Sequence, residues 1–190
     1  MIRTTTIAAL ALAALLIPGR AALAAVDEAE RATLKGLPGV EVIVESPHED
    51  QRRAGFDERA FQTDVELKLR RDGIKVLSRE QRLATPGKPY LYVNINSLHK
   101  KPGSMAAYKI DLRLYQLVRL DRKVDVEAIC DGNAIIRGYR CIDARAVGTH
   151  IAATWSKGVV GYGDLSYTRD HVKDLVDEFI NAWLSVNPKE

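Results

Sequence analysis

The chain has 190 residues, of which 46% are hydrophobic and 28% are charged, and its formal net charge is +3. This length is typical of one domain, and the apolar content is sufficient for a core, which argues against intrinsic disorder. No apolar run long enough to cross a membrane, about 18 residues, occurs after residue 25. A protein with several membrane-spanning helices is therefore excluded.

Residues 1–25 have the three parts of a secretory signal peptide. Arg3 gives a positive start, and the apolar stretch 7–17 follows. Ala22 and Ala24 then supply small side chains at positions −3 and −1 of a cleavage site. A membrane anchor would need about 20 apolar residues, more than this stretch offers.

Cleavage is expected after Ala24, with Ala25 as the alternative. The sequence thus predicts a signal peptide at 1–24 and a single domain at 25–190. The expected location is periplasmic or secreted, without a membrane anchor. Loss of 1–24 leaves 26 of the 28 Lys and Arg residues against 25 Asp and Glu, a net charge of +1. This near neutrality predicts no nucleic-acid partner.

Cys130 and Cys141 are the only cysteines. Because an exported protein meets oxidising conditions, a disulfide between them is expected, worth about 3 kcal/mol for a loop of this size. A redox-active pair is disfavoured because the spacing is not Cys-x-x-Cys. A metal site is disfavoured because two thiolates need further ligands.

In the first part of the mature chain, short helices and strands are predicted to alternate. Phe61, Val65 and Leu69 give one helix an apolar stripe, with Asp57 as its cap and Gly73 at its end. Strands on either side of this helix would be parallel. The expected elements are a helix at 26–35, a strand at 40–45, a polar loop at 46–55, a helix at 57–71 and a strand at 74–80.

Strands dominate the second part. Alternation predicts that Leu91, Val93 and Ile95 share one face of their strand. Thr168 is expected to cap the final helix, and Asn187 with Pro188 to end it. The expected elements are strands at 90–98, 108–120, 124–129 and 149–160, and a helix at 168–186. The class predicted is α+β: a two-layer sandwich of a mixed, mostly antiparallel sheet with two long helices on one face.

The polar face of this sheet is the candidate partner-binding face, because aromatic and Arg side chains are favoured at contact surfaces. The alternative is an ordinary exposed face, in which Tyr is simply a good strand former. The candidate residues are Tyr90, Tyr92, Asn94, Asn96, Arg113 and Tyr115.

Motifs for catalysis, cofactors and metals are missing, so no residue is assigned to these roles. The histidines (His48, His99, His150 and His171) have no metal-ligand spacing, and we interpret them as solvated. The glycines between 158 and 163 lack the Lys-Ser/Thr of a phosphate-binding loop. They are interpreted as the end of a strand or a bulge.

Residues near the C-terminus carry a resemblance. They are Thr154, Trp155, Gly158, Gly161, Gly163, Phe179, Trp183, Leu184, Asn187 and Pro188. With the order of elements, they resemble small exported bacterial α+β domains of unknown function, including LptE-like lipopolysaccharide-transport modules and the amino-terminal domain of the translocation protein TolB. This chain lacks the lipid-attachment Cys of the lipoprotein. The resemblance implies a non-catalytic envelope role and transfers no residue role.

The function predicted is an exported, soluble, non-catalytic module for binding or envelope assembly, with an envelope protein as candidate partner. One alternative is a periplasmic enzyme whose site forms only in the folded chain. Another is a structural homo-oligomer that pairs through an open strand edge. The sequence does not determine the oligomeric state.

Overall fold

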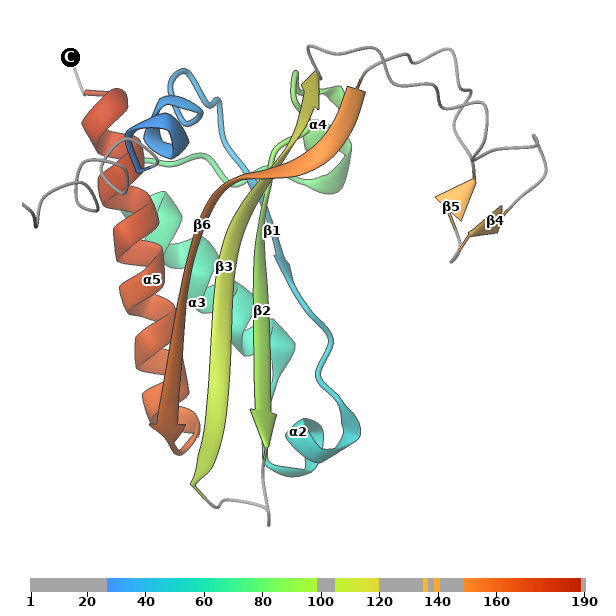
Figure 1. Ribbon diagram of the computed structural model, residues 1–190, viewed down its shortest axis with the longest axis vertical. Coiled ribbons are helices and arrows are strands. Elements are labelled where there is room, and N and C mark those ends of the chain that lie inside the picture. The colour runs from blue at the N-terminus through green and yellow to red at the C-terminus, as the bar shows by residue number, and fades with distance from the viewer. Residues whose placement is uncertain (1–26, 99–104, 120–134, 137–138, 141–148, 189–190) are drawn as a thin grey trace, which may run out of the picture.

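The structure is a computed structural model that describes residues 27–98, 105–119, 135–136, 139–140 and 149–188 (Figure 1). Several expectations lie outside these residues: the cleavage site at Ala24 or Ala25, the disulfide between Cys130 and Cys141, His99, and the strand at 124–129.

The predicted α+β class is confirmed. A helical segment at 27–32 comes first. It is followed by β1 (Glu41–Val44), α2 (Glu49–Arg53), α3 (Glu58–Arg71), α4 (Arg79–Ala84), β2 (Tyr90–Leu98), β3 (Ala106–Arg119), β4 (Ile135–Ile136), β5 (Tyr139–Arg140), β6 (Thr149–Gly163) and α5 (Leu165–Val186). Within the described ranges, no helix is long and apolar enough to span a membrane.

The main sheet has the order β1-β2-β3-β6. β1 is parallel to β2, and β3 is antiparallel to both β2 and β6. The sheet is therefore mixed and mostly antiparallel. β4 and β5 form a separate pair.

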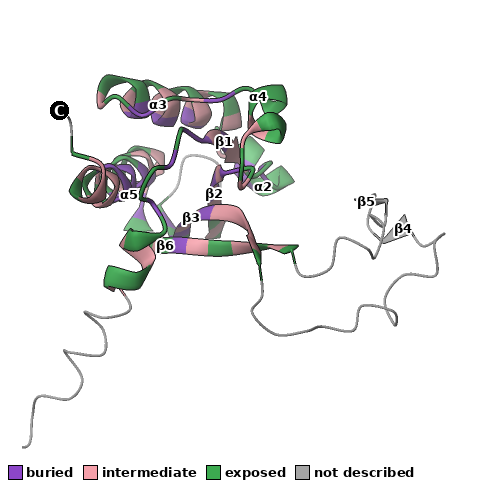
Figure 2. Ribbon diagram, turned by 90° about the horizontal axis from the view of Figure 1, so that it is seen from above, coloured by how far each residue is buried: buried purple, intermediate pink, exposed green. Residues whose placement is uncertain are grey.

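One face of the sheet packs with α3 and α5 in a single hydrophobic core. α3 contacts β1, α5 contacts β3 and β6, and the two helices contact each other (Figures 1 and 2). The predicted helical stripe is buried, and Asp57 accepts a hydrogen bond from the Arg59 N–H at 3.0 Å. The core residues of the two central strands are Leu91, Val93, Ile95, Tyr108, Ile110, Leu112 and Leu114.

The strand expected at 74–80 is wrong. Val76 alone forms a parallel bridge, with Val40 just before β1, and the parallel neighbour of β1 is β2. The chain leaves the extended conformation because Ser78 and Gln81 cap α4. The Ser78 hydroxyl accepts from the Gln81 N–H at 3.2 Å, and the Gln81 side chain accepts from the Ser78 N–H at 2.9 Å.

The loop expected at 46–55 contains a helix, α2. Gln51 is buried there, and its amide donates to the Ile95 carbonyl at 2.7 Å. Its oxygen accepts from the His48 N–H at 2.8 Å. α2 thus provides a hydrogen-bond donor for the Ile95 carbonyl of β2, at a position beyond the last residue that pairs with β1. The local sequence around Gln51 does not reveal this contact.

The final helix begins three residues before the expected start. Asp164, not Thr168, is its cap, and it accepts from the N–H groups of Ser166 at 2.8 Å and Tyr167 at 3.2 Å. The Ser166 hydroxyl also donates to Asp164, at 2.7 Å. This hydrogen bond contributes most to holding the pKa of Asp164 below its usual value, and the two backbone hydrogen bonds add to it. Thr168 lies buried in the first turn, and its hydroxyl donates to the Asp164 carbonyl.

The glycines between 158 and 163 lie within β6, at its C-terminal end. Gly161 is the cross-strand partner of Tyr108 in β3, and the Tyr108 ring lies where a side chain at position 161 would begin. A Cβ there would be 2.5 Å from Tyr108 Cζ. Close approach of an aromatic ring explains this glycine.

Candidate functional site

The six residues predicted to form a partner-binding face share the face of the sheet opposite the core. On β2 they alternate with buried residues, and the register places Tyr90 beside Tyr115 and Tyr92 beside Arg113. We call this surface the open face. On β6 its corresponding positions are Ala153, Ser156, Gly158, Val160 and Tyr162.

Three tyrosines form a cluster at one end of the open face. The rings of Tyr90 and Tyr115 stack with centroids 5.1 Å apart, and Tyr92 meets Tyr115 edge-on at 6.0 Å. Arg82 of α4 lies over the Tyr90 ring at 5.3 Å and pairs with Glu41 of β1. The tyrosine cluster (Tyr90, Tyr92 and Tyr115) is thus held rigidly.

Tyr92 is a hydrogen-bond donor at neutral pH. Burial raises its pKa to about 12, and its hydrogen bond to the Glu45 carboxylate adds to the shift. The phenol therefore stays neutral, and its O–H is oriented by Glu45.

Charged side chains occupy the middle of the open face. Asp111 accepts from Lys109 at 2.9 Å and lies 3.5 Å from the Arg113 guanidinium. Its carboxylate lies over Gly158, 3.0 Å from where a Cβ would stand. The pKa of Arg113 is raised, mainly by its hydrogen bond to Tyr115. Arg113 thus joins the charged centre to the tyrosine cluster.

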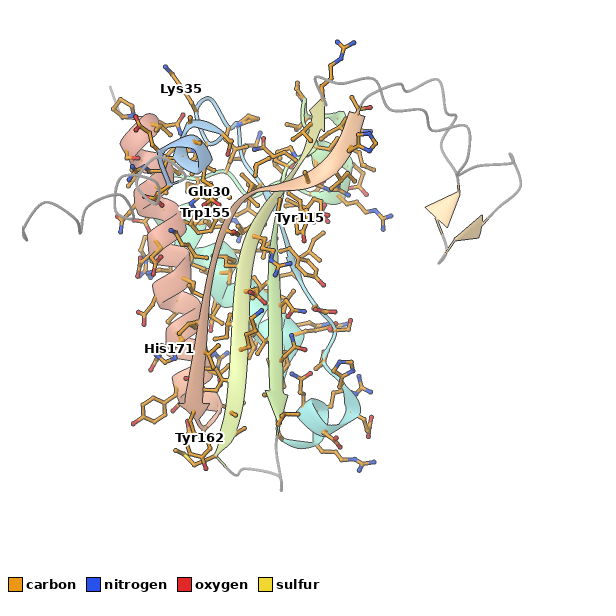
Figure 3. All side chains as sticks on the ribbon, in the orientation of Figure 1. Glu30, Lys35, Tyr115, Trp155, Tyr162 and His171 are labelled. Atoms are coloured by element: carbon orange, nitrogen blue, oxygen red, sulfur yellow. The ribbon has the colours of Figure 1, made fainter. Side chains whose placement is uncertain are left out.

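The opposite end of the open face is apolar, and sequence reasoning missed it. Leu98 and Tyr162 flank Ala107 in one row of the sheet. Leu98 is 81% exposed, Val160 75% and Tyr162 69%. Figure 3 shows Tyr162 at the lower end of the sheet and Tyr115 far above it. Extension of the alternation beyond Asn96 and Val160 would have identified this apolar end (Leu98, Val160 and Tyr162).

Comparison with known proteins gave no match. No protein-family model, curated protein or solved structure matches this chain.

The histidines are not uniformly solvated. His48 is exposed, but Nδ1 of His171 lies 2.5 Å from the hydroxyl of buried Tyr108, and His150 Nε2 is buried without a partner among the described residues. Within the same residues, no group of three or more His, Cys, Asp or Glu side chains could hold a metal ion.

The open face combines rigid aromatic rings, cations and exposed apolar groups. Tyr and Arg contribute most to binding at protein interfaces, and contiguous exposed apolar side chains often mark an interaction site. Its chemistry suits recognition of another macromolecular surface.

Proposed function

We propose that this protein is an exported, non-catalytic module that binds a protein of the cell envelope through the open face. The signal-peptide pattern at 1–24 supports a periplasmic or secreted location. A disulfide between Cys130 and Cys141 would fit that location. The likeness to LptE-like and TolB modules favours an envelope partner.

The observation that carries the proposal is the pair of recognition features on one surface. The tyrosine cluster offers aromatic rings already fixed by their neighbours, so little side-chain entropy is lost when a partner binds. The apolar end exposes large side chains beside one another in the same sheet. A sheet face that only contacts solvent is not expected to have both the tyrosine cluster and the apolar end, since contiguous exposed apolar groups usually mark an interaction site.

Alanine at both Tyr92 and Arg113 is expected to weaken partner binding by about 30-fold or more, since hot-spot residues contribute about 2 kcal/mol or more. The measurement is recovery of the complex from envelope extracts, with the partner identified by mass spectrometry. Both side chains lie on the side of the sheet opposite the core and are only partly buried. The ion pair of Arg113 with Asp111 is partly exposed and contributes little to stability, so the double variant should fold.

A matched control removes the same residue types away from the open face. Tyr167 of α5 and Arg71 of α3 are both exposed, and alanine at both should leave recovery unchanged. Equal recovery with the Tyr92→Ala/Arg113→Ala variant and the unmodified protein would refute the proposed face.

A second candidate function is a structural homo-oligomer, favoured by the position of β6. This 15-residue strand lies at the edge of the sheet. Its one lysine, Lys157, forms an ion pair with Asp27 at 3.0 Å. It therefore adds little of the free charge that usually prevents an edge strand from pairing with another chain. If the function is oligomeric, light scattering after size exclusion should show a mass that rises with concentration. A constant monomer mass would exclude it.

A further inference from the structure

A small cavity lies on the helix side of β6, away from the open face. Its volume is about 300 Å³. Three segments far apart in the sequence line it and leave it open to solvent: the helical segment 27–32, β6 and α5. Its lining residues are Asp27, Arg31, Trp155, Lys157, Glu178, Asn181, Ala182 and Ser185. This volume is at the lower end for ligand sites, about 300–1,000 Å³, so a ligand would be small.

Trp155 is the aromatic residue among those that line the cavity. The residue is 1% exposed, and its ring packs edge-on against Phe179 at 5.2 Å. Its Nε1–H has no acceptor among the described residues. The nitrogen is itself buried, so the ring of Trp155, rather than its N–H, forms part of the cavity wall.

The charges of the cavity are divided between its walls. Asp27 accepts from Lys157 at 3.0 Å and pairs with Arg31 at 3.1 Å, so both its oxygens are engaged. The pKa of Asp27 is lowered, mainly by the hydrogen bond from Lys157, and the carboxylate is ionised. This wall therefore carries one positive charge in excess.

The wall formed by α5 has the opposite sign. Glu178 lies on it next to Asn181, and both residues are exposed. Ser185 donates to the Ala182 carbonyl at 2.7 Å, so its hydroxyl proton is already used. One wall thus attracts an anion and the other a cation.

We propose that this cavity binds a small zwitterion, a free α-amino acid. Its carboxylate would lie near Arg31 and Lys157, beside the Trp155 ring. Its ammonium group would lie near Glu178 and the Asn181 carbonyl. This site lies on the other side of the sheet from the proposed partner face and does not depend on it.

The test follows the fluorescence of Trp155 in the chain that begins at Ala25. Trp183→Phe removes the other tryptophan. Titration of common L-α-amino acids, each to about 10 mM, should give a saturable change for at least one of them. Acetate and methylamine, which carry one charge each, should give none. Calorimetry on the chain with both tryptophans should return the same Kd.

Glu178→Gln is expected to weaken this binding about tenfold or more, because the ammonium group loses its counter-charge. Glu28→Gln is the matched control. Glu28 is an exposed acid on the helical segment 27–32 and does not line the cavity, so its variant should bind as before. The proposal is overturned if no amino acid gives a saturable change, if acetate gives the same change, or if Glu178→Gln binds unchanged.

Discussion

Replacement of Gly161 by valine is expected to lower the free energy of unfolding by about 3 kcal/mol, the upper end of the range for overpacking. Strand propensity alone predicts the opposite, because valine favours strands and glycine does not. The Tyr108 ring decides the sign. It occupies the space of the new Cβ, and Tyr108 cannot easily move because it is 3% exposed and bonded to His171.

Urea denaturation of a double-mutant cycle tests this reason. In a Tyr108→Ala background, Gly161→Val should lose most of its cost, because the ring that it meets is gone. Ala153→Val is the control, since Ala153 is an exposed position of the same strand and should change stability little. An equal cost of Gly161→Val with and without the Tyr108 ring would contradict the explanation.

Replacement of Phe179 by alanine is expected to cost about 3–5 kcal/mol, as is usual for a buried aromatic residue. Phe179 is fully buried and packs edge-on against Trp155, with ring planes at 71°. Its loss leaves a cavity where α5 meets β6. For a domain of this size, each kcal/mol lowers Tm by about 2–4 °C, so a fall of about 10 °C is expected.

Differential scanning calorimetry measures this fall. Leu67→Ala on α3 is the control, because Leu67 is an exposed aliphatic residue and its removal should change Tm little. A comparable loss of stability in the two variants would show that Phe179 does not hold α5 against the sheet.

Local pattern was sufficient where one face of an element is buried and the other is not. The period of two at Leu91, Val93 and Ile95 identified β2 with its bounds and placed four candidate residues on the open face. The stripe at Phe61, Val65 and Leu69 did the same for α3. In both cases the burial that stabilises the element also sets the period of its sequence.

Pattern failed in short segments whose conformation depends on a distant partner. The segment 74–80 is rich in strand formers, yet only Val76 forms a bridge, with Val40 just before β1, and the chain then enters the capped helix α4. Gln51 forms part of a helix because it meets the Ile95 carbonyl, 44 positions away in the chain. Sequence spacing carries no record of such contacts.

The candidate site shows the same division. Alternation brought Tyr90, Tyr92, Arg113 and Tyr115 to one face, but Arg82 and Glu45 reach that face from other elements. Their positions follow from the path of the chain between β1 and β2.

The sequence by itself determined the α+β class, the alternating strands and the six residues of the candidate face, because periodicity is a local consequence of burial. It also showed that many of the hydrophobic residues of the full chain belong to the predicted signal peptide. Two of its three net positive charges belong there as well. Only the tertiary structure decided the partner of β1, the need for glycine beneath Tyr108, the apolar end of the open face and the cavity beside Trp155. Each of these depends on distances between residues far apart in the chain, which the packing of the core fixes.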